Sequence, residues 1–136
     1  MSYEAFFVDF MRGKLRARTA GGHMYTPEQT RADMAAIAYA YRSTGGGMAP
    51  KGVPVSVHVV AGRPMPKSRK GEEEPDVFKP DCDNILKLVM DALNGVAWAD
   101  DAQVTSAHVS KADRRKCEKH PWMHITINWE EGAEDG

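Results

Sequence analysis

The sequence predicts a single α+β domain in which two helices pack on a mixed or antiparallel sheet. Two stretches, 53–59 and 123–129, alternate apolar and polar residues, as strands with one buried face do. Two others, 34–41 and 85–93, repeat apolar residues at the spacing of an amphipathic helix. At 136 residues, the chain has the length of one domain, residues 1–136, with a substantial core. The predicted order of elements is strand, helix, strand, helix, strand, strand.

The chain begins with an aromatic-rich segment, 3–11, that we expect to form the first strand. After it, four cations recur at every second position: Arg12, Lys14, Arg16 and Arg18. An extended backbone would place all four on one face. Such a row suits either a solvent-exposed sheet edge or a series of contacts to phosphate groups. The acidic stretch described below favours phosphate contacts. Gly21-Gly22 then predicts a turn.

The segment Thr26-Pro27-Glu28-Gln29 predicts a helix start, with Thr26 as the cap and Gln29 completing a capping box. The stripe that follows indicates core packing, and its members are Met34, Ile37, Ala38 and Tyr41. Three glycines, 45–47, end this helix, and the alternating segment 53–59 follows as a half-buried strand.

Residues 63–79 contain three prolines, one glycine and a block of basic residues followed by acidic ones. We expect a mobile charged surface loop, which either clamps a substrate or is a solvated insertion. Residues 104–111 predict a strand, a basic turn follows, and 123–129 form the last strand. The acidic tail, 130–136, is expected to fray.

Composition excludes several classes of protein. The longest apolar run is far too short to span a bilayer, and no secretion signal opens the chain, so we expect a cytoplasmic protein. Cys82 and Cys117 have no metal-ligand spacing and are expected to be free thiols. The net charge of −1 does not itself indicate nucleic-acid binding, but basic residues cluster at 12–18, 67–70 and 111–119.

The stretch from 79 to 111 concentrates carboxylates at the two ends of one expected helix. Asp81 and Asp83 precede it, and Asp100 and Asp101 follow it. Carboxylates gathered in this way repel one another unless a cation offsets their charge. We therefore expect them to converge from the two ends of the helix on a divalent metal. Taken singly, each acid also has an ordinary explanation as a cap, a surface ion pair or a turn residue.

Within that helix, Asp83 is expected to be the cap. Lys87 is expected to lie one turn later on a polar face, with Asp91 as its surface ion-pair partner. Asn94-Gly95 predicts the helix end. The expected buried stripe is Ile85, Leu86, Val89, Met90 and Leu93.

The kind of metal follows from the ligands. A calcium loop counted from Asp81 fails, because Leu86 stands where glycine is needed and Ala92 where a bidentate glutamate is needed. Zinc is not favoured, since no histidine lies near and Cys82 alternates away from the neighbouring acids. Hard oxygen ligands indicate Mg²⁺ or Mn²⁺, which leave coordination positions for water and phosphate oxygens.

The segment KPDCDNILKLVMDALNGVAWADDAQV, at 79–104, resembles the central motif of the RusA-like Holliday junction resolvases. It contains the D-x-D-N pair, the lysine three residues after the asparagine, D-A-L-N-G, the tryptophan and D-D-x-Q-V. The upstream segment KLRARTAGGHMYTPEQTR also resembles the family's basic region. The proline-rich, basic end of the first strand that is usual in the family is replaced here by FMRGKLRARTA.

The resemblance implies a homodimeric, Mg²⁺-dependent endodeoxyribonuclease of bacterial or phage origin that cuts two opposed strands of four-way DNA, in recombination and repair. By position it implies metal-binding catalytic carboxylates at Asp81, Asp83 and Asp101, with Asp100 as a weaker ligand candidate and Lys87 as the essential lysine. Six cations are expected to contact DNA: Arg12, Lys14, Arg16, Arg18, Lys79 and Lys111. The alternatives are a nuclease for flaps or other branched DNA, and a DNA-binding relative without catalysis.

Overall fold

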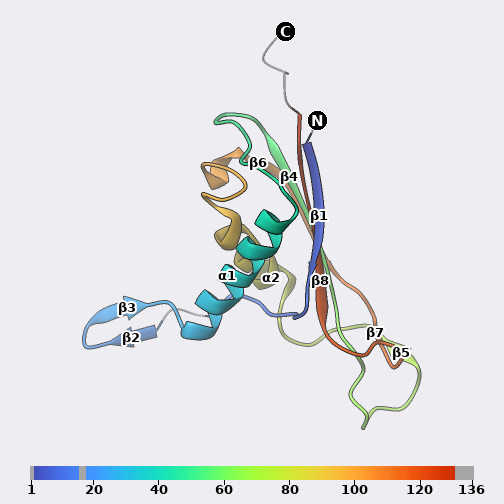
Figure 1. Ribbon diagram of the computed structural model, residues 1–136. Coiled ribbons are helices and arrows are strands. Elements are labelled where there is room, and N and C mark those ends of the chain that lie inside the picture. The colour runs from blue at the N-terminus through green and yellow to red at the C-terminus, as the bar shows by residue number, and fades with distance from the viewer. Residues whose placement is uncertain (1, 16–17, 131–136) are drawn as a thin grey trace.

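Four strands form the central sheet of the computed structural model, which describes residues 2–15 and 18–130 (Figure 1). They lie in the order β1 (Ser2–Val8), β8 (Trp122–Trp129), β4 (Val55–Gly62) and β6 (Val104–Lys111). β4 and β6 run parallel, while the other two pairs are antiparallel. The predicted mixed sheet is confirmed, and the bounds of β6 agree with the prediction.

The burial of side chains on the two central strands follows the alternation in the sequence. The buried residues of β4 pair with buried residues of β8: Val57 with Ile127, and Val59 with Ile125. The residues between them face the other side of the sheet. One face of the sheet is therefore apolar throughout its centre, and this face must be covered.

Two helices, α1 (Glu28–Ser43) and α2 (Cys82–Leu93), cover that face (Figure 1). Elements of the main layer therefore follow the order β-α-β-α-β-β in one α+β domain, as predicted. Three members of the stripe predicted for α1, Ile37, Ala38 and Tyr41, are buried, and the fourth, Met34, is partly buried against the core.

The buried stripe of α2 differs from the prediction. Leu88 and Ala92 are buried, while Leu86 and Met90 are only partly buried. α2 packs against both α1 and β6, so its buried face is set by two neighbours that the local spacing does not reveal.

Both helices begin without the predicted side-chain caps. α1 starts at Glu28, and Gln29 donates its amide to Asp33 at 2.8 Å instead of closing a capping box with Thr26. α2 starts at Cys82, with Asp81 in the cap position and Asp83 in the first turn. The predictions of Thr26 and Asp83 as caps are wrong. α2 begins at Cys82, one residue before the predicted cap, so Asp83 already lies inside the helix. In α1 the Gln29 side chain is hydrogen-bonded to Asp33 within the helix and is not available to close a capping box.

Two short ladders lie outside the main sheet. β2 (Arg18–Ala20) and β3 (His23–Tyr25) form a hairpin around Gly21-Gly22, whose φ angles of 58° and 83° suit glycine, so the predicted turn is confirmed. β5 (Glu73–Glu74) pairs with β7 (Arg114–Arg115) beyond the end of the sheet. The 3₁₀ turn η1 (Asp101–Gln103) precedes β6.

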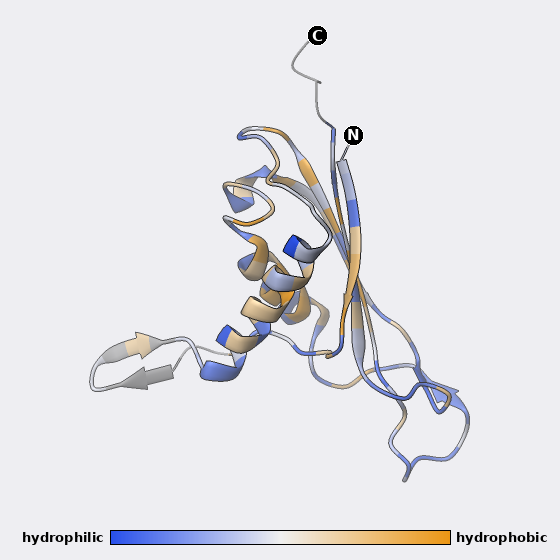
Figure 2. Cartoon of the chain, in the orientation of Figure 1, coloured by the Kyte–Doolittle hydropathy of each residue, from blue (hydrophilic) through white to orange (hydrophobic). Residues whose placement is uncertain are grey.

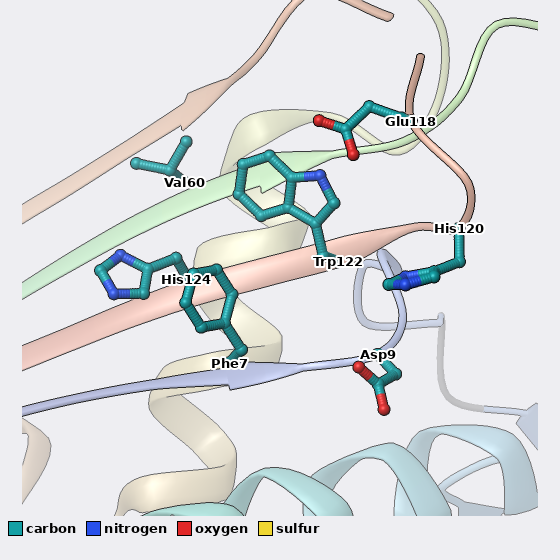
Figure 3. A pocket seen from close by; sticks show the side chains of 7 residues that line it. All are labelled: Phe7, Asp9, Val60, Glu118, His120, Trp122 and His124. Atoms are coloured by element: carbon teal, nitrogen blue, oxygen red, sulfur yellow. The ribbon is translucent and has the colours of Figure 1, made fainter. Parts of the chain in front are cut away.

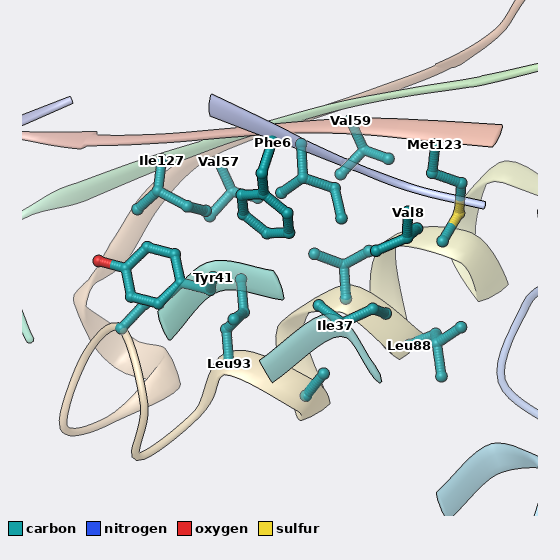
Figure 4. Close-up of a cluster of buried hydrophobic side chains, with 14 of the residues drawn as sticks. Phe6, Val8, Ile37, Tyr41, Val57, Val59, Leu88, Leu93, Met123 and Ile127 are labelled. Atoms are coloured by element: carbon teal, nitrogen blue, oxygen red, sulfur yellow. The ribbon is translucent and has the colours of Figure 1, made fainter. Parts of the chain in front are cut away.

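The core lies between the helices and the sheet (Figure 4). Ile37, Leu88 and Leu93 from the helices meet the apolar face of the sheet, and each has no exposed surface. The Phe6 ring meets the Tyr41 ring edge to face, with centroids 5.9 Å apart. Burial, with a smaller contribution from Glu4, raises the pKa of Tyr41 to about 12, and its hydroxyl donates to the Gly47 carbonyl. This core fixes both ends of α2 relative to the sheet.

The opposite face of the sheet and one of its edges are open. Tyr3 and Phe7 are exposed on β1, at 60% and 63%. β6 is an edge strand among the described residues, and four consecutive side chains at 105–108 are exposed. Cys82 and Cys117 are free, as predicted. Neither helix in the described part of the chain has the length and apolar character needed to cross a membrane. The predicted frayed tail lies outside the described residues from 131 onward.

Candidate active site and basic cleft

The start of α2 presents two of the predicted catalytic carboxylates to solvent. Asp81 occupies the cap position and Asp83 the first turn, and both are exposed. Lys79 Nζ lies 2.9 Å from Asp81 Oδ2. Among the described residues, the Asp83 side chain has no hydrogen-bond or ion-pair partner, although its backbone belongs to α2. Lys87 follows Asp83 by one turn and is also exposed.

A cleft of about 410 Å³ lies between this helix start and the segment after β1. Four cations line it: Arg12, Lys14, Arg63 and Lys79. The two walls meet closely at Gly13, where an added Cβ would lie 2.9 Å from the Asn84 Cβ. The Lys14 amide donates to the Asn84 carbonyl at 2.9 Å. Glycine at this position allows the basic segment to lie against the acidic helix start.

Like Lys79, the predicted DNA-contacting cations Arg12 and Lys14 have ion-pair partners inside the protein. Arg12 makes a two-pronged ion pair with buried Asp33, at 2.7 and 2.9 Å, and the hydrogen bond from Arg12 to Asp33 raises the pKa of the Arg12 guanidinium. Lys14 pairs with Asp91 at 2.5 Å. The predicted pairing of Asp91 with Lys87 is therefore wrong. The reason is tertiary, because the segment after β1 brings Lys14 to the middle of α2.

The other members of the predicted basic row are not placed. Arg16 lies outside the described residues, and so does the side chain of Arg18, although its backbone pairs in β2.

A buried carboxylate fixes the loop that leads into α2. Asp76 accepts two hydrogen bonds from Arg63, each 2.8 Å long, and its side chain is fully buried. Burial alone would raise the pKa of Asp76, but hydrogen bonds from Arg63 and the Phe78 amide, with the charges of Arg63 and Lys111, lower it below its ordinary value. Lys111 also donates to the Pro80 carbonyl at 3.1 Å. The end of β6 is thereby tied to the start of α2.

The remaining predicted acids lie in the turn before β6. Asp100 caps η1 by accepting a hydrogen bond from the Ala102 amide at 3.0 Å. Asp101 accepts one from Trp98 Nε1 at 2.8 Å, and the Trp98 ring is fully buried. Gln103 holds this turn to the start of β4 by donating to the carbonyls of Pro50 and Val53. Asp100 thus stabilises the turn as its cap, while the buried Trp98 indole orients the Asp101 carboxylate.

Within one chain, the two groups of acids do not converge. α2 has 12 residues, which sets its ends about 18 Å apart. The eight residues of β6 run back from Val104, just after the turn that holds Asp101, to Lys111 beside the helix start. No group of three or more His, Cys, Asp or Glu residues in the described ranges is placed to hold a metal ion. A metal site that uses both groups needs carboxylates from two ends of the molecule.

A separate pocket of about 550 Å³ lies on the open face of the sheet (Figure 3). The rings of Phe7, Trp122 and His124 form its floor, and Asp9 and Glu118 lie at its rim. The Phe7 and His124 ring centroids are 4.5 Å apart. These residues lie on the face opposite to α2, so they do not join the predicted acids.

Two residues that shape the candidate site were not predicted as part of it. Arg63 lines the cleft and donates to the Lys79 carbonyl at 2.8 Å, and Asp76 holds Arg63 in place. The sequence places them in a loop of mixed charge without indicating which charges pair. The mobility expected of this 63–79 loop stays a prediction.

Comparison with known proteins gives two matches. The family model described as endodeoxyribonuclease RusA matches residues 11–128. The uncharacterized protein YqaN of Bacillus subtilis (strain 168) is 44% identical over 68 residues, which are 43% of this chain and 48% of that protein. The chain thus spans about half the length of this relative. The family match covers most of the described domain, including the acids at both ends of α2.

Proposed function

The chain belongs to the endodeoxyribonuclease RusA family, and from this premise we propose that it resolves four-way DNA junctions by paired, symmetric cuts that depend on Mg²⁺ or Mn²⁺. The observation that carries the proposal is the pairing of exposed Asp81 and Asp83 with a cleft lined by four cations. Cations hold a phosphate backbone, and carboxylates beside it can hold a divalent ion. The proposed setting is the cytoplasm of a bacterium or of a phage-infected cell.

In this proposal Asp81, Asp83 and Asp101 supply oxygen ligands, and Lys87 faces the phosphate near Asp83. When bound by these carboxylates, a divalent ion would supply an activated water and would offset negative charge on the phosphate. The start of α2 contributes as well, because its first backbone N–H groups have no side-chain cap and favour an anion. Lys79 and Lys111 flank the same helix start, and we propose that they help to position the DNA.

We propose further that the acids meet across a homodimer. Antiparallel pairing of β6 with β6 of a second copy, about a two-fold axis, would set the start of one strand beside the end of the other. Asp101 of one copy would then approach Asp81 and Asp83 of the other. Asp100 and Lys111, of opposite charge, would also be brought together. Two equivalent sites related by a two-fold axis suit two symmetric cuts.

The character of β6 supports this arrangement. It is an eight-residue edge strand without proline, and it carries no charge before Lys111. Proteins usually protect an edge of this length with prolines, charges or bulges, and of these β6 has one irregularity near its start, where Thr105 is skipped in the register with β4. Stacking the open sheet faces instead would leave a helix layer on each outer side, and the acids of the two copies would stay far apart.

The direct test is incubation of the protein with a four-way junction, a flap and a linear duplex, in Mg²⁺ or in EDTA. We expect paired cuts at symmetric positions in the junction, in Mg²⁺ only. Equal cutting of all three substrates would remove the junction assignment and leave a general nuclease. Binding of the junction without metal-dependent cutting would indicate a DNA-binding relative and contradict the catalytic proposal.

Trp98→Phe offers a finer test of how Asp101 is positioned. Phenylalanine keeps most of the buried ring and removes the N–H that orients the Asp101 carboxylate. We expect kcat for junction cleavage to fall by about 10- to 100-fold, as when the partner of a metal ligand is removed, with unchanged junction affinity.

Tyr41→Phe is the matched control, because it also removes one donor from a buried ring but lies away from the acids. Equal losses of kcat in the two variants would mean that Trp98 acts only through stability. Thermal unfolding of both variants measures that contribution.

A further inference from the structure

A basic groove lies beyond the end of the main sheet. It lies between residues 63–67 and the turn 114–119, and its volume is about 690 Å³. Its charged residues are Arg63, Lys67, Arg114, Lys116, Glu118 and Lys119. In Figure 2 the corresponding region, around β5 and β7 at the lower right, is mostly hydrophilic.

The charges of the groove are unequally compensated. Arg63 is paired with Asp76, and Arg114 with Glu74. Lys67, Lys116 and Lys119 have no ion pair among the described residues, and Glu118 is the one acid among the groove-lining residues. Three uncompensated lysines against one glutamate leave a net charge of two positive units facing the groove. An anionic ligand is therefore favoured.

The backbone that carries these lysines is anchored. Met65 is buried, and its amide donates to the Arg115 carbonyl at 3.2 Å. The Lys116 amide donates to the Glu72 carbonyl at 2.9 Å. The Phe78 ring lies 4.3 Å from the Arg114 guanidinium. These contacts connect the loop, β7 and the segment before α2 into one unit, so the lysine positions are set by the fold.

The groove continues into the cleft at the start of α2. Arg63 lines both of them. It also donates to the Lys79 carbonyl, two residues before Asp81. A chain of phosphates that passes the carboxylates can therefore follow Arg63 into the groove.

We propose that the basic groove binds the phosphate backbone of a duplex arm that extends from the branch point. This rests on the proposed function, since the DNA must first be placed at the acids. The groove contributes affinity without sequence preference, because lysines that contact phosphate carry no base information. The anchored residues 63–67 of the loop then form one wall of the DNA-binding surface.

The test compares two triple variants of equal charge change. K67Q/K116Q/K119Q removes the groove lysines, and R31Q/R42Q/K51Q removes three exposed cations elsewhere on the surface. Junction binding is measured in EDTA by fluorescence anisotropy across a range of salt concentrations. Each lost phosphate contact lowers the slope of log K against log salt by about 0.9, so we expect the groove variant to lose about 2 to 3 units and at least about tenfold in affinity.

Arm length provides a second, independent readout. Shortening the junction arms from about 15 to about 5 base pairs, at 3.4 Å each, removes about 34 Å of backbone. We expect this to weaken the wild type and the surface control, and to leave the groove variant almost unaffected. K67R/K116R/K119R keeps the charges and should retain wild-type binding.

Two results would overturn the proposal, and they are distinguishable. If the wild type binds the junction and the groove variant has the same slope and arm dependence as the surface control, the groove has no role in DNA binding. If the wild type binds no branched DNA, the proposed function falls together with the groove. Circular dichroism and thermal unfolding of all variants establish that each is folded.

Discussion

Asp83→Asn is expected to abolish cleavage of four-way DNA while junction binding is retained or strengthened. The substitution keeps the shape of the side chain and removes one metal-binding charge. The loss of rate should exceed the roughly 10- to 100-fold typical of residues that only support a metal ligand. Binding should not fall, because a negative charge that faces phosphate is removed.

Stability should change little in this variant. Asp83 is exposed, and its carboxylate contributes only through the positive end of α2, by less than about 1 kcal/mol. Single-turnover cleavage, junction binding in EDTA and urea unfolding measure the three quantities separately. Cleavage at the wild-type rate would remove Asp83 from the catalytic set.

Mixing two inactive variants tests whether each site is shared between copies. Asp83→Asn and Asp101→Asn should each be inactive alone. In a mixed dimer, one site carries both substitutions and the other carries neither, so one intact acid set is restored. Coexpression of the two variants should therefore recover nicking of one junction strand.

The control for this experiment is a mixture of Asp83→Asn with Asp81→Asn. These two positions lie at the same helix start, so every site in that mixed dimer lacks one acid and activity should stay absent. If the wild type cuts the junction, failure of the first mixture to recover nicking would contradict the shared site.

Asp76→Asn is expected to give the largest loss of stability among the charged residues considered. Its carboxylate is fully buried and accepts both hydrogen bonds of the Arg63 guanidinium. Breaking a buried pair leaves a charge without its partner, and we expect the free energy of unfolding to fall by about 3 kcal/mol. Glu73→Gln is the control: its pair with Arg115 is exposed, and its loss should cost less than about 1 kcal/mol. Urea unfolding measures both, and equal effects would contradict the structural role of Asp76.

The pH dependence of this contribution has a defined sign. The pKa of Asp76 in the folded protein lies below its ordinary value of 3.8. The stabilisation is therefore complete above the ordinary value and is lost as the pH falls through the lower, folded-state value. Relative to wild type, Asp76→Asn should lose less stability between pH 5 and pH 3 as the solution is acidified, because its side chain does not titrate.

Local patterns predicted the main layer of the fold. The alternation in β8 and the change of composition at both ends of β6 depend only on neighbouring residues. The bounds of β6 were therefore predicted correctly, and those of β8 to within one residue. The α1 stripe was predicted for the same reason. The α2 stripe was not, because the burial of Leu88 and Ala92 depends on where α1 and β6 lie.

Ion pairs and strand pairs between segments distant in the sequence could not be predicted from local patterns. Lys14 and Asp91 are 77 positions apart, and no local spacing distinguishes this pair from the expected one between Asp91 and Lys87. The ladder of β5 with β7 joins Glu73 to Arg115 in the same way. The sequence motif singled out the acids, and their role as metal ligands stays a prediction. Their separation within one chain was not expected, because the motif indicates the two ends of a helix and not the distance between them.

The separation of acids at opposite ends of α2 also bears on how a cell tolerates such an enzyme. Under the proposed pairing, a newly synthesised chain holds two incomplete acid sets, so it cannot nick a chromosome on its own. At low expression, activity would rise with the square of the chain concentration, since two copies must meet before either site is complete. The concentration of the chain would then limit unwanted cutting, because active dimers would form in number only after enough chains had accumulated.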